Sequence, residues 1–245
     1  MSLSVRVALA FAAFCLLFAA AAGLFLFCFP QLGGFMEVDS EKTELPMPTR
    51  ARRRIILDAG HGGIDGGAST RGGICEKDLN LQITNILANL LTQCGYEVTL
   101  TRTDDEMLSD DGEGSRKMRD LRARLGIARE QPDALFISIH MNTYPSQACR
   151  GLQVYYTKND TSARELASAV QSTVHDCLQP DNTRAIKAAD SSIYLLDRST
   201  SCAILIECGF LSCVEEAALL AAPDYQQRLA AAIANAIVSY TQKEL

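Results

Sequence analysis

The sequence predicts a single α/β domain with a mostly parallel, twisted sheet of about six strands flanked by helices, preceded by an N-terminal transmembrane helix. Short apolar runs typical of buried strands alternate with longer segments of helical periodicity, and a charge-free apolar run comes before them. An apolar content of 48% excludes a disordered protein. The net charge of −6 argues against nucleic acid as the main partner.

The first segment has the properties of a membrane anchor. Residues 7–29 are continuously apolar and carry no charge, which is long enough to cross a hydrocarbon core of about 30 Å. Arg6 precedes this run, so the positive-inside tendency places the amino terminus in the cytoplasm and the rest of the chain outside. A cleaved signal peptide is the alternative, because residues 19–23 are small, but the length of the run favours an uncleaved anchor.

Three regions follow from this division. The anchor occupies residues 1–29, a linker with proline, glycine and mixed charge occupies residues 30–53, and the folded domain occupies residues 54–245.

Within the folded domain, apolar runs and helical spacing alternate almost to the end. Leucines and isoleucines recur at helical spacing after residue 76, and Gly95 closes that helix, while Pro132 ends the next one. Strands are expected at 55–58, 96–101, 134–140, 151–156, 193–196 and 203–207. Helices are expected at 76–94, 118–128, 161–177, 215–220 and 225–240, the last capped by Asp224, with an irregular stretch at 180–190.

Three of the expected strands end on a side chain suited to chemistry. The first runs into a glycine loop that contains His61, the third runs into His140, and the last runs into Glu207. Open α/β sheets bind their ligands at the carboxyl ends of the strands. We therefore expect these side chains to gather at one edge of the sheet.

Two imidazoles and one carboxylate are a donor set that suits catalytic zinc. His61, Glu76 and His140 would leave a fourth position for water, which zinc activates while it polarises a carbonyl. A further carboxylate is then needed as general base, and Glu207 is the candidate. Because Glu207 ends an apolar strand, burial is expected to raise its pKa.

Other interpretations of these residues stay open. Either histidine could be structural, Glu76 could be a first-turn helix charge, and the glycine loop could hold phosphate, although it lacks GxGxxG and the P-loop lysine. His175 is expected to be solvated. The nine cysteines form no CxxC pair, which indicates neither a disulfide framework nor a structural zinc site. A thiol nucleophile at Cys208 is a less favoured alternative.

The motifs LDAGHGG, EKDLNL, SIHMN and IECGFLS, in this order between residues 57 and 212, resemble the four signatures of zinc-dependent N-acetylmuramoyl-L-alanine amidases. The resemblance covers essentially residues 55–240. It implies zinc held by His61, Glu76 and His140, with Glu207 as the catalytic carboxylate and residues 54–245 as the catalytic domain. The implied reaction hydrolyses the amide between the lactyl group of N-acetylmuramic acid and L-alanine in peptidoglycan. Arg102 also matches a family feature, and we expect it to have a structural or substrate-orienting role.

A narrower resemblance is to the spore-cortex amidases of endospore formers, carried by the anchor and by residues 187–190 and 193–196. It implies a membrane-anchored enzyme on the extracytoplasmic side that removes peptides so that muramic δ-lactam can form for germination, with an activating partner protein. The alternatives are an amidase of general cell-wall turnover or cell separation, a peptidase on the same sheet, and a catalytically inactive peptidoglycan-binding protein.

Overall fold

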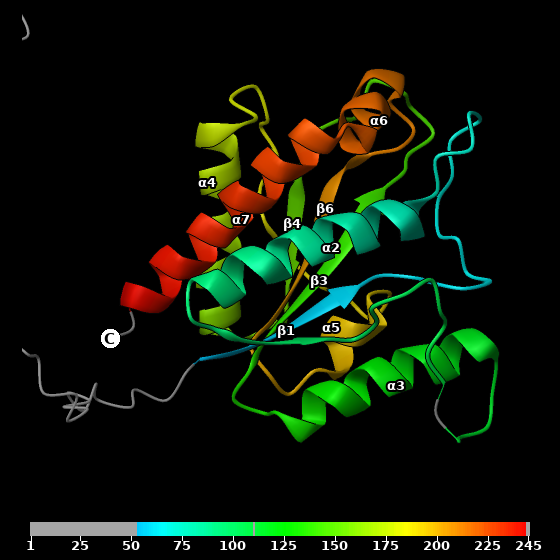
Figure 1. Ribbon diagram of the computed structural model, residues 1–245, viewed down its shortest axis with the longest axis vertical. Helices are drawn as coiled ribbons and strands as arrows, with labels where there is room; N and C mark the ends of the chain where they lie inside the picture. The colour runs from blue at the N-terminus through cyan, green and yellow to red at the C-terminus, as the bar shows by residue number, and fades with distance from the viewer. Residues whose placement is uncertain (1–52, 110, 244–245) are drawn as a thin grey trace, which may run out of the picture. The chain divides into compact units, whose positions relative to one another are not determined.

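A six-stranded sheet forms the centre of the computed structural model, which describes residues 53–109 and 111–243 (Figure 1). The strands are β1 (Arg54–Ala59), β2 (Glu97–Leu100), β3 (Leu135–Asn142), β4 (Gln153–Tyr156), β5 (Lys187–Ala188) and β6 (Ala203–Phe210). The helices are α2 (Glu76–Gln93), α3 (Arg116–Glu130), α4 (Thr161–Cys177), α5 (Tyr194–Arg198), α6 (Val214–Ala221) and α7 (Pro223–Lys243).

The sheet has the strand order β2-β1-β3-β6-β4-β5 and is mostly parallel. The β4–β6 pairing is antiparallel, and β5 pairs parallel to β4, so β4 and β5 both run opposite to the other four strands. The carboxyl ends of β1, β3 and β6 therefore meet at the same edge, as the sequence predicts.

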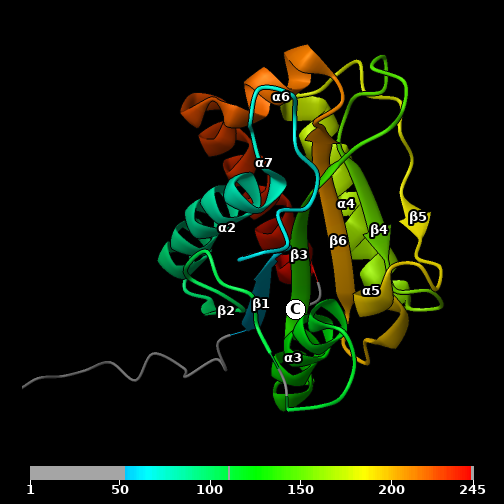
Figure 2. The same ribbon diagram turned by 90° about the vertical axis from the view of Figure 1, so that its right-hand side faces the viewer.

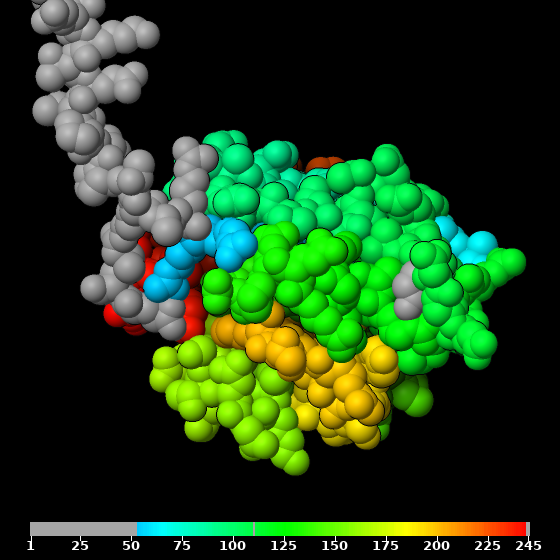
Figure 3. Space-filling view, turned by 90° about the horizontal axis from the view of Figure 1, so that it is seen from below, coloured from blue at the N-terminus to red at the C-terminus, as the bar shows by residue number. Residues whose placement is uncertain are grey.

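The two faces of the sheet are covered unequally. Helices α2, α4 and α7 pack together over one face and bury the larger hydrophobic core, whereas α3 and α5 cover the other face with a smaller core. Figure 2 shows α2 and α7 on one side of the strands and α5 on the other. In the space-filling view from below, α3 lies directly against the segment that carries α5, so this end of the smaller core is closed (Figure 3).

Strand alternation decides which side chains face the smaller core. Ile56, Phe136 and Leu205 lie in it, whereas their chain neighbours lie in the larger core. Because side chains alternate along a strand, the next positions on the same face are Asp58, Ser138 and Glu207, with His140 following Ser138. The polar residues of the three central strands thus share the face that α3 and α5 only partly cover.

Two of the secondary-structure predictions are wrong. Residues 193–196, expected as a strand, lead into the short helix α5, in which the adjacent Leu195 and Leu196 are both buried. A strand would send these two side chains to opposite faces, so only a helical turn lets both enter the smaller core. The stretch 180–190, expected as irregular, contains the two-residue strand β5, whose exposed side chains give no apolar signal.

The helix and strand ends also differ in detail. Helix α7 begins at Pro223, so Asp224 lies in its first turn rather than at the cap. Strands β3 and β6 continue past His140 and Glu207, and their register shifts between His140 and Asn142. These two side chains therefore lie within the last part of their strands and not beyond them.

The predicted anchor at residues 1–29 and nearly all of the predicted linker at 30–53 lie outside the described residues. In the part of the chain that is described, none of the helices combines the length and apolar character needed to span a bilayer. None of the seven cysteines of this part forms a disulfide bond.

Candidate metal centre and catalytic cavity

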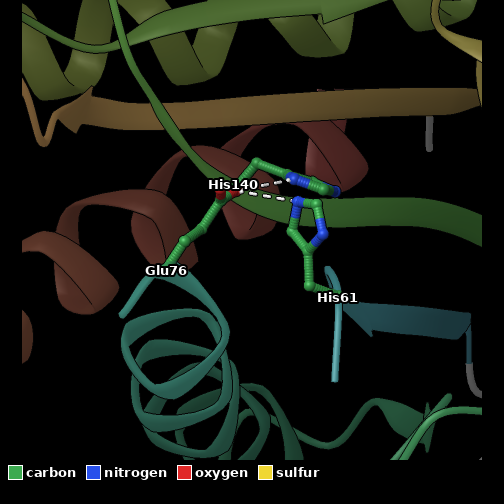
Figure 4. Close-up of side chains that lie close together, drawn as sticks. All are labelled: His61, Glu76 and His140. Carbon is green, nitrogen blue, oxygen red and sulfur yellow. Dashed lines mark hydrogen bonds and ion pairs between the residues drawn. The ribbon is translucent and has the colours of Figure 1, made fainter. Parts of the chain in front are cut away.

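His61, Glu76 and His140 converge at the carboxyl edge of the sheet (Figure 4). One potential ligand atom from each residue lies within 4.8 Å of the other two. Glu76 Oε1 is 3.3 Å from His61 Nε2 and 3.0 Å from His140 Nδ1. The two imidazole rings meet edge to face, with centroids 5.0 Å apart. Three donors of the types that zinc prefers therefore face one small volume.

Each donor comes from a different element. His61 lies in the loop after β1, Glu76 is the first residue of α2, and His140 lies in β3. The loop turns sharply at His61, whose φ of 60° is in the left-handed region that side chains other than glycine rarely adopt. Such an outlier persists only where surrounding contacts enforce it, and it is common at functional sites.

The donors are held by contacts on their other sides. Asp65 Oδ2 lies 3.0 Å from His61 Nδ1, leaving Nε2 to face Glu76, in the way that metal-bound histidines are usually oriented by a carboxylate. Glu76 accepts hydrogen bonds from the backbone N–H groups of Ala68 and Met141. Asp65 belongs to the candidate site through this contact with His61, and the sequence analysis does not identify it. The sequence does offer one signal for this role of Asp65, namely that an acidic residue stands four positions after His61 in the same glycine loop.

The close packing of Glu76 and His61 shifts the pKa values of both side chains. Burial would raise the pKa of Glu76, but the two neighbouring histidines outweigh it and hold that pKa far below its ordinary value of 4.5. Burial would lower the pKa of His61, yet Glu76 and Asp65 outweigh it and raise that pKa above 6.5. Glu76 is therefore ionised at neutral pH and available to a cation.

Two glycines make room for the donors. A Cβ atom on Gly60 would lie 2.3 Å from the His140 ring, and one on Gly67 would lie 2.5 Å from Glu76 Oε2. Gly67 also has a φ of +65°, which glycine adopts at little cost. Gly60 and Gly67 thus leave the space that the donors of the candidate metal site occupy, which supports a fit of these residues to a metal ion.

Glu207 lies beside these three residues without joining them. It pairs in register with His140 across β3 and β6, so both side chains project from the same face. Its Oε2 atom is buried and has no hydrogen-bond partner among the described residues. Burial raises the pKa of Glu207 to about 7, as does the charge of Glu76, although the two histidines oppose this rise. The structure confirms the predicted direction of this shift.

A cavity of about 190 Å³ lies beside the candidate metal donors and Glu207. His61, His140 and Glu207 line it on the sheet side, and Lys117 of α3 and Tyr194 of α5 line it on the helix side. The cavity exists because α3 and α5 leave this edge of the face uncovered. A substrate bond held there would lie beside His61, His140 and the carboxyl group of Glu207.

The remaining candidates fall outside the cavity. His175 is partly exposed on α4 and pairs with its neighbour Asp176, in agreement with the predicted solvated position. Cys208 is fully buried in the larger core on the opposite face, and burial raises the pKa of its thiol, so it is not the nucleophile. Arg102 is buried beside the site and binds backbone carbonyl groups, which fits its predicted structural role.

An open α/β sheet that gathers a metal-type donor set and a buried acid at one edge has the components that metal-dependent hydrolases use. Residues 55–239 match the family of N-acetylmuramoyl-L-alanine amidases. The chain belongs to this family and is an enzyme that acts on peptidoglycan.

Similar proteins span the same region. The germination-specific N-acetylmuramoyl-L-alanine amidase of Bacillus subtilis is 37% identical over 189 residues, which cover 76% of this chain and 78% of that protein. The CwlD amidase of Clostridioides difficile, solved in complex with the GerS lipoprotein, has a TM-score of 0.74 and 36% identity, and the match covers 78% of this chain and 99% of that one. An amidase of Nostoc punctiforme has a TM-score of 0.68 and 32% identity, covering 78% and 97%.

Proposed function

We propose that this amidase uses zinc, held by His61, Glu76 and His140, to hydrolyse the amide between the lactyl group of N-acetylmuramic acid and L-alanine, with Glu207 as general base and acid. The observation that carries the proposal is the convergence of three donor atoms within 4.8 Å of one another, beside a cavity that His61, His140 and Glu207 line. Two imidazoles and one carboxylate are a set that catalytic zinc sites use, with a position left for water.

The metal and Glu207 have separate tasks. Zinc, when bound, lowers the pKa of a water molecule to about 7 and polarises the carbonyl group of the substrate. Glu207, which lines the cavity, accepts the proton of the attacking water at its carboxylate, and then gives this proton to the amide nitrogen of the departing alanine. A pKa of about 7 suits both transfers, because the group loses and regains a proton readily at neutral pH.

The biological setting we propose is modification of spore-cortex peptidoglycan on the extracytoplasmic side, with the chain held at the membrane by residues 7–29. Similarity to a germination-specific amidase supports the cortex role. Similarity to an amidase solved in complex with a lipoprotein supports an activating partner of that kind. The continuous apolar run supports the anchor.

Muropeptide analysis by mass spectrometry tests the reaction. The full chain is incubated with purified sacculi and with purified cortex, with and without zinc and with and without a candidate lipoprotein. We expect intact stem peptides with a free L-alanine amino group to be released only when zinc is present, with cortex cleaved faster than vegetative wall. Equal rates on both polymers would favour an amidase of general wall turnover.

Two other results would contradict the proposed activity. Cleavage within the stem peptide would identify a peptidase. Binding to sacculi without release of peptide, unchanged by a chelator, would identify a binding protein. Glu207→Gln is the matched control, because it should keep zinc and lose the released peptide.

A further inference from the structure

Two arginines are buried beneath the loop that carries His61. Arg102, which follows β2, is 2% exposed, and Arg124, on α3, is 1% exposed. Buried guanidinium groups are rare in proteins unless their charge and hydrogen bonds are fully used. Their ten donor hydrogens therefore need acceptors within the protein.

Together they bind the backbone oxygens of three consecutive residues. The Ala59 carbonyl accepts from Arg102 Nε at 2.9 Å and from Arg124 Nη1 at 2.7 Å. The Gly60 carbonyl accepts from Arg102 Nη2 at 3.1 Å. The His61 carbonyl accepts from Arg124 Nη2 at 2.7 Å. The path of the chain from the end of β1 through the metal donor is therefore fixed by these two side chains.

Arg102 also connects two metal donors. Its Nη2 atom binds the carbonyl of Lys77 at 2.8 Å, in the first turn of α2 directly after Glu76. The same nitrogen binds Gly60, directly before His61. One guanidinium thus sets the spacing between the segments that present His61 and Glu76.

Arg124 is held from behind by carboxylates. Asp58 Oδ1 lies 2.6 Å from its Nη1 atom, and Asp120 Oδ2 lies 2.8 Å from its Nε atom. These partners balance its charge and fix the plane of the guanidinium. Its Nη2 atom donates to Asp120 Oδ1 at 3.1 Å and to the carbonyl of His61, the residue with φ of 60°. Arg124 therefore binds the backbone at the residue whose left-handed conformation is unfavourable on its own.

We propose that Arg102 and Arg124 are positioning residues of the metal centre, which hold His61 in its left-handed conformation and at its distance from Glu76. The inference rests on the proposed metal site. A guanidinium spreads five donors over three nitrogens in one rigid plane, so separate nitrogens can reach a carboxylate and a carbonyl on different sides, whereas all three donors of a lysine leave a single nitrogen. Arg124→Lys should therefore keep the ion pair with Asp58 and lose the contact with His61.

The test measures metal binding and loop order in the full chain. Zinc affinity is measured by competition with a chromophoric chelator, and cobalt absorption spectra report the geometry of the ligands. We expect Arg124→Lys and Arg102→Lys to raise the zinc Kd at least about tenfold, the lower end of the effect of altering groups that orient metal ligands. The cobalt bands should change in both variants.

Hydrogen exchange on the metal-free protein supplies a readout independent of zinc and of activity. Exchange of the amides of residues 59–67 should speed up in both lysine variants. Leu125→Ala is the matched control, because Leu125 follows Arg124 but packs in the smaller core, and it should lower Tm without changing zinc Kd or loop exchange. If Arg124→Lys does not fold, Asp120→Asn replaces it, with the same expected direction.

Wild-type zinc Kd and wild-type exchange of residues 59–67 in both lysine variants would overturn the proposal. An equal loss of zinc affinity in Leu125→Ala, at the same fall in Tm, would overturn it as well, because general destabilisation would then explain the effect. A failure of the proposed reaction is seen separately, in the muropeptides released by the zinc-loaded wild type.

Discussion

His140 on β3 lies directly opposite Glu207 on β6 in the register of two parallel strands. Neighbouring strands are about 4.8 Å apart, and paired residues project from the same face. The sheet itself therefore places the proposed acid–base group beside a metal donor, with no contribution from a loop. This relationship makes the role of Glu207 testable by a change that leaves the donors untouched.

Replacing Glu207 with glutamine should abolish proton transfer while the metal donors stay in place. We expect kcat to fall by about 10²- to 10⁴-fold, the usual contribution of a general acid–base group. Peptide release measured by mass spectrometry, together with zinc content, checks this outcome. Glu215→Gln, at an exposed site on α6, is the control and should keep full activity. Unchanged turnover in Glu207→Gln would remove this residue from the mechanism.

The three histidines of the chain allow the zinc content of donor variants to be compared with that of a histidine variant away from the donor set. His61→Ala or His140→Ala should lower the zinc content below one equivalent, because each removes a donor from a set of three. His175→Ala should not change it, since His175 pairs only with Asp176 on α4. Elemental analysis measures the content. A chelator should likewise remove activity and added zinc should restore it. A full equivalent of zinc in both donor variants would place the metal elsewhere.

The convergence of His61, His140 and Glu207 could be predicted from the sequence because strand ends in an α/β sheet converge by topology, whereas Glu76 lies at the start of α2 and completes the donor set by its chemistry. The contacts that support them could not. Arg124 reaches the carbonyl of His61 over a separation of 63 residues, and in the sequence it belongs to an arginine-rich helix that resembles a solvated face. Its burial follows from the way α3 packs on the sheet, which no local pattern encodes.

The helix α5 was missed for a related reason. A short apolar run does not distinguish a strand from a helical turn by periodicity. The tertiary requirement that Leu195 and Leu196 both enter the smaller core decides the outcome. Long amphipathic helices such as α4 and α7 were predicted correctly, because several turns of spacing define their buried face.

Gly60 lies so close to His140 that adding a single methyl group at this position should weaken metal binding. Its Cβ atom would lie 2.3 Å from the imidazole, so Gly60→Ala must displace the ring. We expect zinc affinity to fall by about 10- to 100-fold, as when groups that orient a metal ligand are lost. Gly126→Ala, in α3 with no atom near its Cβ position, should instead stabilise the fold by about 0.5–1 kcal/mol. Unaltered zinc affinity in Gly60→Ala would show that this packing is not required.

The buried carboxylate of Asp58 predicts how stability depends on pH. Burial would raise the pKa of Asp58, but the charge of Arg124 and hydrogen bonds from Ser138 and Thr101 outweigh it and lower that pKa below 3.8. A carboxyl group whose pKa is lowered by folding stabilises the protein fully above its unfolded pKa. This stabilisation is lost as the pH falls through the lower, folded pKa.

Asp58→Asn should therefore cost about 3–5 kcal/mol of unfolding free energy at pH 7, because it leaves Arg124 without its closest buried partner. The difference from wild type should shrink as the pH drops below about 4, where the unfolded carboxyl group takes up a proton. Urea unfolding of the metal-free protein between pH 7 and pH 3 measures both effects. Asp133→Asn, whose side chain is 86% exposed in its pair with Arg54, should change little at any of these pH values. A difference between Asp58→Asn and wild type that stays constant across this range would show that Asp58 is not held ionised by folding.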